Sequence, residues 1–441
     1  MMHISRRAKR WLCLLALVIL APAARHFLPD DANRPYTLRP DQVGTAATGN
    51  HEERILAAID AIRAGKMADA RATVDAILAE QPNYRLAHLL SADLYAMRAM
   101  PLSTIGGGAE QARQNQQLAE RLADLRKEAQ VRINYRNMPT PPEMVPANIL
   151  QFAPEQKYAV LVDADTSRLY VFANQNGTPK MVIDHYVTVG KLGIGKQVEG
   201  DQRTPIGVYF VNKHLPRPLL DKTYGERADL YGVGAWPISY PNELDKSDKK
   251  TGYGIWLHGS PAATYARPPQ ASNGCVVLTN EEMLNVAQYL QVGATPVIVT
   301  PKVEWLELKQ WQQRQQAARQ LIEQWRTAWE SLDNQRYLNF YGSRFLSPEG
   351  QNLTSWRLQK MAVNAGKQWT KVKISDLSMF AVTGPEPQLV TTFEQDYTSN
   401  NLDNQMRKRL YWQVENGQWK IRWEGAPINE VRVYDPKPMT E

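Results

Sequence analysis

The sequence predicts a multidomain protein with an N-terminal α-helical domain, a central mostly-β domain and a C-terminal α+β domain. Its 441 residues correspond to about three domains at roughly 150 residues each. Apolar residues recur at helical spacing before a proline cluster at 138–146 and at strand spacing after it. A second helical pattern at 305–332, followed by further strand patterns, marks the third domain.

The composition is that of a soluble globular protein. Hydrophobic residues make up 43% and charged residues 22% of the chain. This balance excludes a polytopic membrane protein, a disordered chain and a collagen-like fibre. Two cysteines are too few for a disulfide scaffold or a structural zinc cluster.

Residues 1–24 have the pattern of a secretory signal peptide. Four basic residues precede an apolar run at 11–20, and the small residues at 21–24 offer a cleavage site. The run is shorter than the roughly 20 residues that a transmembrane helix needs. We therefore expect export to the periplasm, with an uncleaved inner-membrane anchor as the alternative.

More than half of the net positive charge of the chain comes from this signal. The formal net charge is +7, and residues 1–24 contain four basic and no acidic residues, so the rest of the chain carries +3. No basic stripe interleaved with aromatic residues follows. We therefore expect no nucleic-acid partner.

The predicted helical domain spans residues 45–137. Its apolar residues recur at helical spacing, with turns at Gly65 and Pro82. The stretch 57–99 resembles a tetratricopeptide helical hairpin, because it has a turn at Gly65 and a Pro-Asn-Tyr run that begins at Pro82. An array of such repeats needs three or more to bury a shared core, and only about one and a half are present.

A long polar helix is expected at 109–132, followed by a linker at 138–154. The helix is rich in glutamine, arginine and glutamate. It could bind a partner or mediate oligomerisation through the helical domain. We favour a helix whose polar face is simply exposed to solvent, since charged helix faces are usually solvated. Four prolines at 138–146 predict that the linker is extended.

The central domain, 155–302, combines strand patterns with long loops and one short helix. We expect strands at 157–162, 168–172, 182–189, 207–212, 254–258 and 295–299, and a helix at 281–290. The fifth strand ends at His258, and the loop that follows ends in a tight turn at 272–275. The sequence thus predicts a histidine at a strand end, upstream of that turn.

The turn contains Cys275, the one cysteine that remains once the signal with Cys13 is removed. Its thiolate is the reactive form, and a thiol with a pKa near 8.5 needs a neighbouring base such as His258. The alternative is a buried structural thiol. The combination of a strand-borne histidine and a glycine-containing turn favours a nucleophile, and N–H groups around Gly274 could stabilise an oxyanion.

These residues resemble the signature of the YkuD-type L,D-transpeptidase family. The family's His-Gly dipeptide corresponds to His258 and Gly259, and its Ser-x-Gly-Cys turn corresponds to residues 272–275. Its upstream Thr-Pro-x-Gly signature corresponds to residues 204–207. The resemblance covers about residues 157–300 and implies an exported enzyme that acts on peptidoglycan stem peptides.

The resemblance also implies roles for individual residues. Cys275 would attack the carbonyl of the third residue of a stem tetrapeptide and expel the terminal D-alanine. His258 would be the general base, and the main-chain carbonyl of Gly259 would orient its ring. Ser272, next to Gly274 in the turn, either contacts substrate or braces the turn.

Two residues depart from the family's usual pattern. Asn273 stands where many members have histidine or another bulky polar residue, and Val277 stands where many have arginine or asparagine. Both positions lie near the acyl pocket in the family. The departures leave the nucleophile in place and leave the acceptor of the acyl group open.

Three further residues are candidates for substrate binding. Tyr231 and Trp256 could line the donor groove, although aromatic residues of a β domain are more often core. Arg267, in the loop between His258 and Cys275, either meets a substrate carboxylate or is solvated. We expect no metal and no cofactor, because the histidines lie apart and no glycine-rich phosphate loop is present.

The C-terminal domain, 303–441, resembles a nuclear-transport-factor-2-like (NTF2-like) cone. We expect a helix at 305–332 and strands at 372–377, 388–397, 409–415 and 419–424. An Asn-Gly turn at 416–417 joins the last two strands. By analogy of fold, the tryptophans and tyrosines of this domain suit a glycan or peptide ligand.

Three functions stay open. The domain order resembles cell-shape-determining L,D-carboxypeptidases, in which water takes the acyl group from the tetrapeptide. An L,D-transpeptidase would transfer the same acyl group to an amine of a second stem peptide. The third possibility is a catalytically inactive wall-binding scaffold, against which the intact pair of His258 and Cys275 argues.

Overall fold

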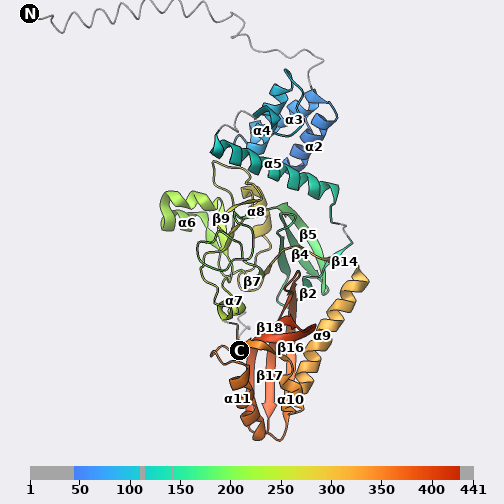
Figure 1. Cartoon of the computed structure of the whole chain (residues 1–441), viewed down its shortest axis with the longest axis vertical. Coiled ribbons are helices and arrows are strands. Elements are labelled where there is room, and N and C mark those ends of the chain that lie inside the picture. Colours follow the sequence, from blue (N-terminus) through green and yellow to red (C-terminus); the bar gives the residue numbers. More distant parts are fainter. Residues whose placement is uncertain (1–43, 110–114, 141–142, 428–441) are drawn as a thin grey trace, which may run out of the picture.

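The computed structural model describes residues 44–109, 115–140 and 143–427. The expected signal peptide, 1–24, lies outside these residues. The chain is arranged as a helical unit, a central mixed domain and a C-terminal sheet domain, one after the other (Figure 1). The multidomain order that the sequence predicts is therefore confirmed for the central and C-terminal domains, and the N-terminal helices are present.

Four helices of the N-terminal unit surround one apolar core. They are α2 (His51–Arg63), α3 (Met67–Glu80), α4 (Arg85–Ala96) and α5 (Gln116–Asn137). Ile55, Ile59 and Val74 are buried at its centre. A tetratricopeptide character stays a prediction.

The polar helix begins later and is less solvated than we expected. α5 starts at Gln116, because the Asn115 side chain accepts hydrogen bonds from the first backbone N–H groups of the helix. Glu128 and Arg132 are 1% and 3% exposed. Figure 1 shows α5 between the other helices and the central domain. The polar face is therefore an interface within the chain at Glu128 and Arg132, where the solvated interpretation was wrong, whereas most other polar residues of α5 are exposed.

The second half of the expected linker, 138–154, forms strands. β1 (Val145–Pro146) pairs with β14 (Trp305–Leu306), and β2 (Ile149–Gln151) pairs with the edge of the C-terminal sheet. Trp311 Nε1 donates a hydrogen bond to the Ile149 carbonyl at 2.8 Å. The proline pattern predicts extended backbone correctly, but it gives no sign that a distant strand edge binds this backbone.

The central domain contains a five-stranded sheet and a smaller four-stranded sheet. The larger sheet has the order β5 (Thr178–Tyr186), β4 (Arg168–Gln175), β3 (Tyr158–Asp163), β13 (Pro296–Thr300), β7 (Gly207–Phe210). The smaller sheet has the order β12 (Val276–Val277), β10 (Trp256–His258), β9 (Gly234–Pro237), β8 (Leu215–Pro216). A separate pair joins β11 (Gln270–Ser272) to β6 (Val189–Gly190).

Short elements fill what the sequence pattern left as loops. They are α6 (Arg217–Tyr224), a 3₁₀ helix (Gly225–Tyr231), α7 (Glu243–Ser247) and α8 (Asn280–Ala287). Of these, only α8 was expected, at 281–290; in the structure Thr279 and Glu282 form a capping box at its start. Strands of two to four residues are too short to show an alternating pattern.

The C-terminal domain is a curved, mostly antiparallel sheet, in which only β15 and β19 pair in parallel, with the long helix α9 (Leu308–Glu330) alongside it (Figure 1). Its strand order is β15 (Tyr341–Leu346), β19 (Gln418–Gly425), β18 (Leu402–Glu415), β17 (Gln388–Ser399), β16 (Thr370–Val382), β2. Two helices, α10 (Asn334–Leu338) and α11 (Leu353–Ala365), complete it.

The aromatic residues of this domain form its core. Trp325 and Trp412 are fully buried, and the Trp329 ring stacks on Tyr397 at 5.3 Å between centroids. Their burial accounts for the aromatic content without a ligand. The proposed glycan or peptide ligand of this domain therefore stays a prediction from analogy of fold.

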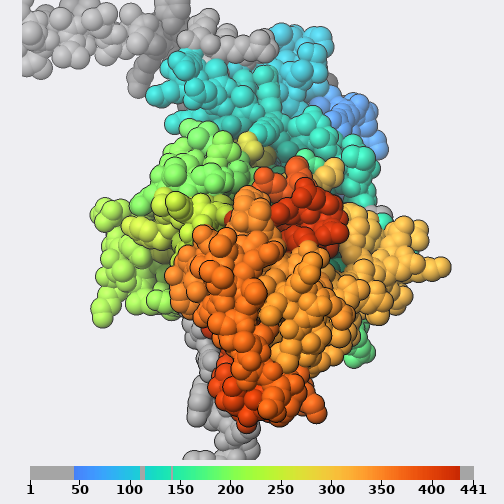
Figure 2. All heavy atoms as spheres, turned by 60° about the horizontal axis from the view of Figure 1, so that its bottom comes forward, coloured from blue at the N-terminus to red at the C-terminus, as the bar shows by residue number. Residues whose placement is uncertain are grey.

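A second apolar core joins the central and C-terminal domains. It contains Phe210 of β7, Phe380 of β16 and Trp423 of β19. At its edge, the Tyr411 hydroxyl donates a hydrogen bond to the buried carboxylate of Glu243 at 2.6 Å. Figure 2 shows the orange and red C-terminal domain lying directly against green and yellow residues of the central domain.

We predict that Phe380→Ala destabilises the junction. Phe380 is 1% exposed, and its truncation leaves a cavity that costs about 3–5 kcal/mol. Urea denaturation followed by tryptophan fluorescence measures the change. Leu402→Ala is the matched control, since Leu402 is 53% exposed and such surface changes stay within about 0.5 kcal/mol. Equal midpoints for both variants would contradict a shared core.

Candidate active site

Two short strands place the histidine and the cysteine beside each other. β10 and β12 pair in parallel, with Leu257 opposite Val276. His258 ends β10, and Cys275 directly precedes β12. In this register Cys275 is level with Trp256, two residues before His258, so the side chains of His258 and Cys275 lie on the same face although residues 259–274 separate them in sequence.

The cysteine turn is braced by hydroxyl groups on both sides. Ser272 Oγ donates to the carbonyl of Cys275 at 2.6 Å and accepts from the N–H of Gly274 at 3.1 Å. Thr204 Oγ1 donates to the Gly274 carbonyl at 2.9 Å and accepts from the N–H of Gly190 at 2.9 Å. The geometry assigns Ser272 a bracing contact within the turn.

Gly274 is required by this close packing. Its φ is +123°, and a Cβ atom there would lie 2.8 Å from the carbonyl oxygen of Arg203. A side chain would therefore push the turn away from residues 203–204. The hydrogen bond from Thr204 to the Gly274 carbonyl thus joins the Thr-Pro-x-Gly motif to the Ser-x-Gly-Cys motif.

His258 is buried and held in one orientation. It is 4% exposed, and its Nδ1 lies 2.7 Å from the Gly259 carbonyl. This carbonyl can only accept, so Nδ1 carries the proton and Nε2 is left as the basic nitrogen. Burial lowers the pKa of His258 to about 4, so the ring is neutral at pH 7.

Gly259 cannot be replaced without displacing a neighbour. A Cβ atom at this position would lie 2.1 Å from Asn280 Oδ1. The same Asn280 oxygen accepts a hydrogen bond from the N–H of Val233 at 3.1 Å. The start of α8 thus fixes the backbone whose carbonyl orients the imidazole.

Cys275 is partly buried and lies against strand β10. Its Sγ lies 3.4 Å from the Gly254 carbonyl. Burial raises the pKa of the thiol to about 11, although a backbone bond from Trp256 and the positive charges of Arg267 and Lys196 favour the thiolate. The resting pair at neutral pH is consequently a thiol and a neutral imidazole.

The pair lies in a cleft of about 860 Å³. One wall is aromatic, because the Tyr231 ring lies 4.7 Å from Trp256 and meets the His258 ring edge-on at 5.4 Å. Arg267 lines the cleft with Cys275. A groove with aromatic walls and one guanidinium suits an extended peptide that carries a carboxylate.

Most of the residues expected from sequence meet in this cleft. Its lining includes Cys275, His258, Ser272, Asn273, Tyr231, Trp256 and Arg267. Gly259 and Gly274 lie behind it and shape the backbone. Thr204 and Asn280 were missed as site residues. Thr204 lies in the Thr-Pro-x-Gly motif and was therefore detectable, whereas Asn280 has no such signal.

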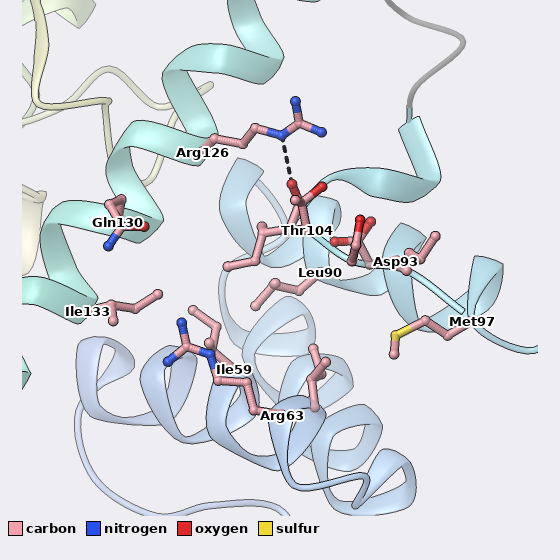
Figure 3. Close-up of a pocket in the computed structure, with 13 residues that line it drawn as sticks. Ile59, Arg63, Leu90, Asp93, Met97, Thr104, Arg126, Gln130 and Ile133 are labelled. Carbon is pink, nitrogen blue, oxygen red and sulfur yellow. Dashed lines mark hydrogen bonds between the residues drawn. The ribbon is translucent and has the colours of Figure 1, made fainter. Parts of the chain in front are cut away.

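A second cavity, of about 540 Å³, lies in the helical unit (Figure 3). Aliphatic side chains such as Ile59, Leu90 and Ile133 line it. Its carboxylate, Asp93, already accepts from the N–H groups of Gly106 and Gly108 at 2.6 and 3.0 Å. Neither histidine nor cysteine is among its described lining residues.

The described residues contain no group of three or more His, Cys, Asp or Glu that could hold a metal ion. Within the same part of the chain, every helix is too short or too polar to cross a bilayer.

Comparison with known proteins places both domains. A model of the L,D-transpeptidase catalytic domain (YkuD) matches residues 157–299, and a model of the Cds6 C-terminal NTF2-like domain matches residues 317–425. A search of curated protein sequences finds no match.

Two solved structures share this architecture. Bd1075 from Bdellovibrio bacteriovorus is 30% identical, with a TM-score of 0.55, over 65% of this chain and 99% of that chain. The helical cell shape determining protein Pgp2 from Campylobacter jejuni is 24% identical, with a TM-score of 0.53, over 67% of this chain and 99% of that chain. The likeness to Pgp2 concerns the fold. The chain belongs to the YkuD L,D-transpeptidase family and carries a C-terminal NTF2-like domain.

Proposed function

We propose that the protein is a peptidoglycan-remodelling cysteine enzyme that forms an acyl-enzyme with stem tetrapeptides. The observation that carries this proposal is the pairing of His258 and Cys275 on adjacent strands in one cleft of an L,D-transpeptidase domain. The aromatic wall and Arg267 offer binding for a peptide with free carboxylates.

The acylation step follows from the protonation states of the pair. As Sγ of Cys275 attacks the carbonyl carbon of the third residue, Nε2 of His258 takes the thiol proton. The C–N bond to the terminal D-alanine then breaks, and His258 returns the proton to the leaving amine. The product is a thioester between Cys275 and the tripeptide, with D-alanine released.

Proton transfer during attack is required because the thiol is not ionised beforehand. A pKa of about 11 for Cys275 and about 4 for His258 makes the uncharged pair the stable form across neutral pH. The Gly274 N–H already donates to Ser272. We therefore assign oxyanion stabilisation to the N–H of Cys275 itself.

The acceptor decides between two reactions of the same thioester. Water, deprotonated by His258, gives an L,D-carboxypeptidase that trims tetrapeptide to tripeptide. An amine of a second stem peptide gives an L,D-transpeptidase. The shared architecture with Pgp2, described as a cell shape determining protein, supports a role in cell shape and leaves both acceptors as candidates.

The location follows from the substrate. Peptidoglycan lies outside the cytoplasmic membrane, and the signal-like pattern of residues 1–24 supports export. We propose a periplasmic enzyme on these two grounds. The inactive wall-binding scaffold is the weaker alternative, because an inactive protein has no need of the two braces that hold the cysteine turn.

We predict that the purified protein converts disaccharide tetrapeptide and that Cys275→Ala abolishes the conversion. Mass spectrometry of the products separates the candidates. Tripeptide with free D-alanine indicates a carboxypeptidase, and a cross-linked dimer indicates a transpeptidase. Unchanged substrate, with the unfolding midpoint showing a folded protein, would contradict both. Activity in Cys275→Ala would show that the nucleophile is wrong.

We also predict a strong pH dependence for alkylation of Cys275 by iodoacetamide. Because burial raises the thiol pKa to about 11, the thiolate fraction and the rate should rise about tenfold per pH unit from pH 7 to 10. A free cysteine peptide is the control, and its rate levels off above about pH 8.5. Peptide mapping identifies the modified residue. A rate at Cys275 that is already constant near pH 7 would indicate a thiolate–imidazolium pair instead.

A further inference from the structure

The loop that joins the two catalytic motifs packs against the helical unit. Asn83, in the turn between α3 and α4, donates from Nδ2 to the Ala262 carbonyl at 2.8 Å. The Asn83 carbonyl accepts from the N–H of Tyr265 at 3.3 Å. One residue of the helical unit therefore holds the backbone of residues 261–271, here called the catalytic loop, at two points.

Side chains of the catalytic loop enter the core of the helical unit. The Tyr265 ring lies 4.8 Å from the Tyr84 ring and 5.2 Å from the His51 ring, and its hydroxyl lies 3.1 Å from His51 Nδ1. Ala266 is 3% exposed and belongs to the same apolar cluster as α2, α3 and α4. Of the two residues before Arg267, Ala266 is thus buried and Tyr265 partly buried against a different domain.

The far side of the loop is held at the next residue. The carbonyl of Arg267 accepts from the Tyr186 hydroxyl at 2.9 Å and from Thr188 Oγ1 at 3.1 Å. The guanidinium of Arg132, on α5, stacks over the Tyr186 ring at 3.7 Å. The helical unit therefore contacts Ala266, directly before Arg267, and also Tyr186, whose hydroxyl binds the Arg267 carbonyl.

Arg132 is itself fixed by a buried ion network across the domain boundary. Glu52 of α2 accepts from Arg132 at 2.8 Å and from Arg168 of the central domain at 2.9 Å. Burial alone would raise the pKa of Glu52, but the charges of these two arginines hold it below its ordinary value. Breaking such a network is costly, so the two domains keep one relative position at this contact.

The helical unit also brings a second cation toward the cleft. Arg85 is exposed at the start of α4. Burial lowers the pKa of Arg267, and the positive charge of Arg85 lowers it further. Two like charges from different domains repel, and a carboxylate bound beside them would relieve that repulsion.

We propose that the helical unit is a positioning element of the active site. It clamps the catalytic loop so that the guanidinium of Arg267 stays in the cleft beside Cys275. There Arg267 binds a carboxylate of the peptide substrate, a role that rests on the proposed function. The matches to family models begin at residue 157, so they assign no role to this unit.

Two conservative variants test the clamp in the full chain. Asn83→Ala removes the bond to the loop from the helical side, and Tyr186→Phe removes only the hydroxyl under the Arg267 carbonyl. Both should raise KM for disaccharide tetrapeptide about twofold to tenfold, the factor for one lost hydrogen bond, while kcat stays near the parent value. Arg71→Ala is the matched control, because Arg71 stacks on Tyr95 within the helical unit at 4.3 Å.

A probe that needs no peptide substrate separates this proposal from the proposed function. The ratio of alkylation rates at Cys275 with anionic iodoacetate and neutral iodoacetamide reports the charge at the cleft. Arg267→Ala should lower this ratio about fivefold, as one charge a few ångströms away does in water. Asn83→Ala and Tyr186→Phe should lower it less, and Arg71→Ala should leave it unchanged.

A double variant decides whether the clamp acts through Arg267. If it does, adding Asn83→Ala to Arg267→Ala changes neither the ratio nor KM further. An unchanged ratio in Asn83→Ala, even where Tyr186→Phe in β5 of the central domain lowers it, or fully additive losses in the double variant, would overturn the proposal. A lowered ratio in a protein that does not convert tetrapeptide would support the positioning role of the helical unit and contradict the proposed substrate.

Discussion

The parallel pairing of β10 with β12 is the constraint on which the active site depends. It places His258 and Cys275 on adjacent strands, and parallel strands cannot be joined by a tight turn. The chain must therefore leave His258, cross over and return in the same direction. The catalytic loop is that crossover, and its length makes it need support from outside the central domain. The helical unit supplies this support through Asn83 and Tyr84.

The environment of the site favours a thiol and a neutral imidazole over a thiolate–imidazolium ion pair. Burial opposes charge on both partners, raising the pKa of Cys275 and lowering that of His258. Reaction then depends on orientation, since the proton has to move as the carbon–sulfur bond forms. Thr204, Ser272 and the carbonyl of Gly259 serve this orientation. Their bonds fix the turn on one side and the imidazole ring on the other.

Sequence patterns predicted that His258 and Cys275 belong to one site and predicted the domain order, but not the contacts between domains. The strand-His-Gly and Ser-x-Gly-Cys motifs are local, so they could be found without a fold. The linker was misjudged because the pairing of Ile149 with Phe380 joins residues far apart in the chain. The burial of Glu128 and Arg132 in α5 was missed for the same reason: a polar helix face has the same pattern whether water or a complementary ion network covers it. Short strands such as β9 and β12 owe their existence to neighbours and leave no periodicity.

Intact-protein mass spectrometry can detect the thioester that we propose between Cys275 and the stem peptide. The protein is mixed with disaccharide tetrapeptide, the reaction is quenched in acid within seconds, and the mass of the intact protein is measured. We expect an added mass equal to the substrate minus D-alanine, which peptide mapping locates on Cys275. Release of D-alanine with no adduct at any quench time, or an adduct on another residue, would contradict it.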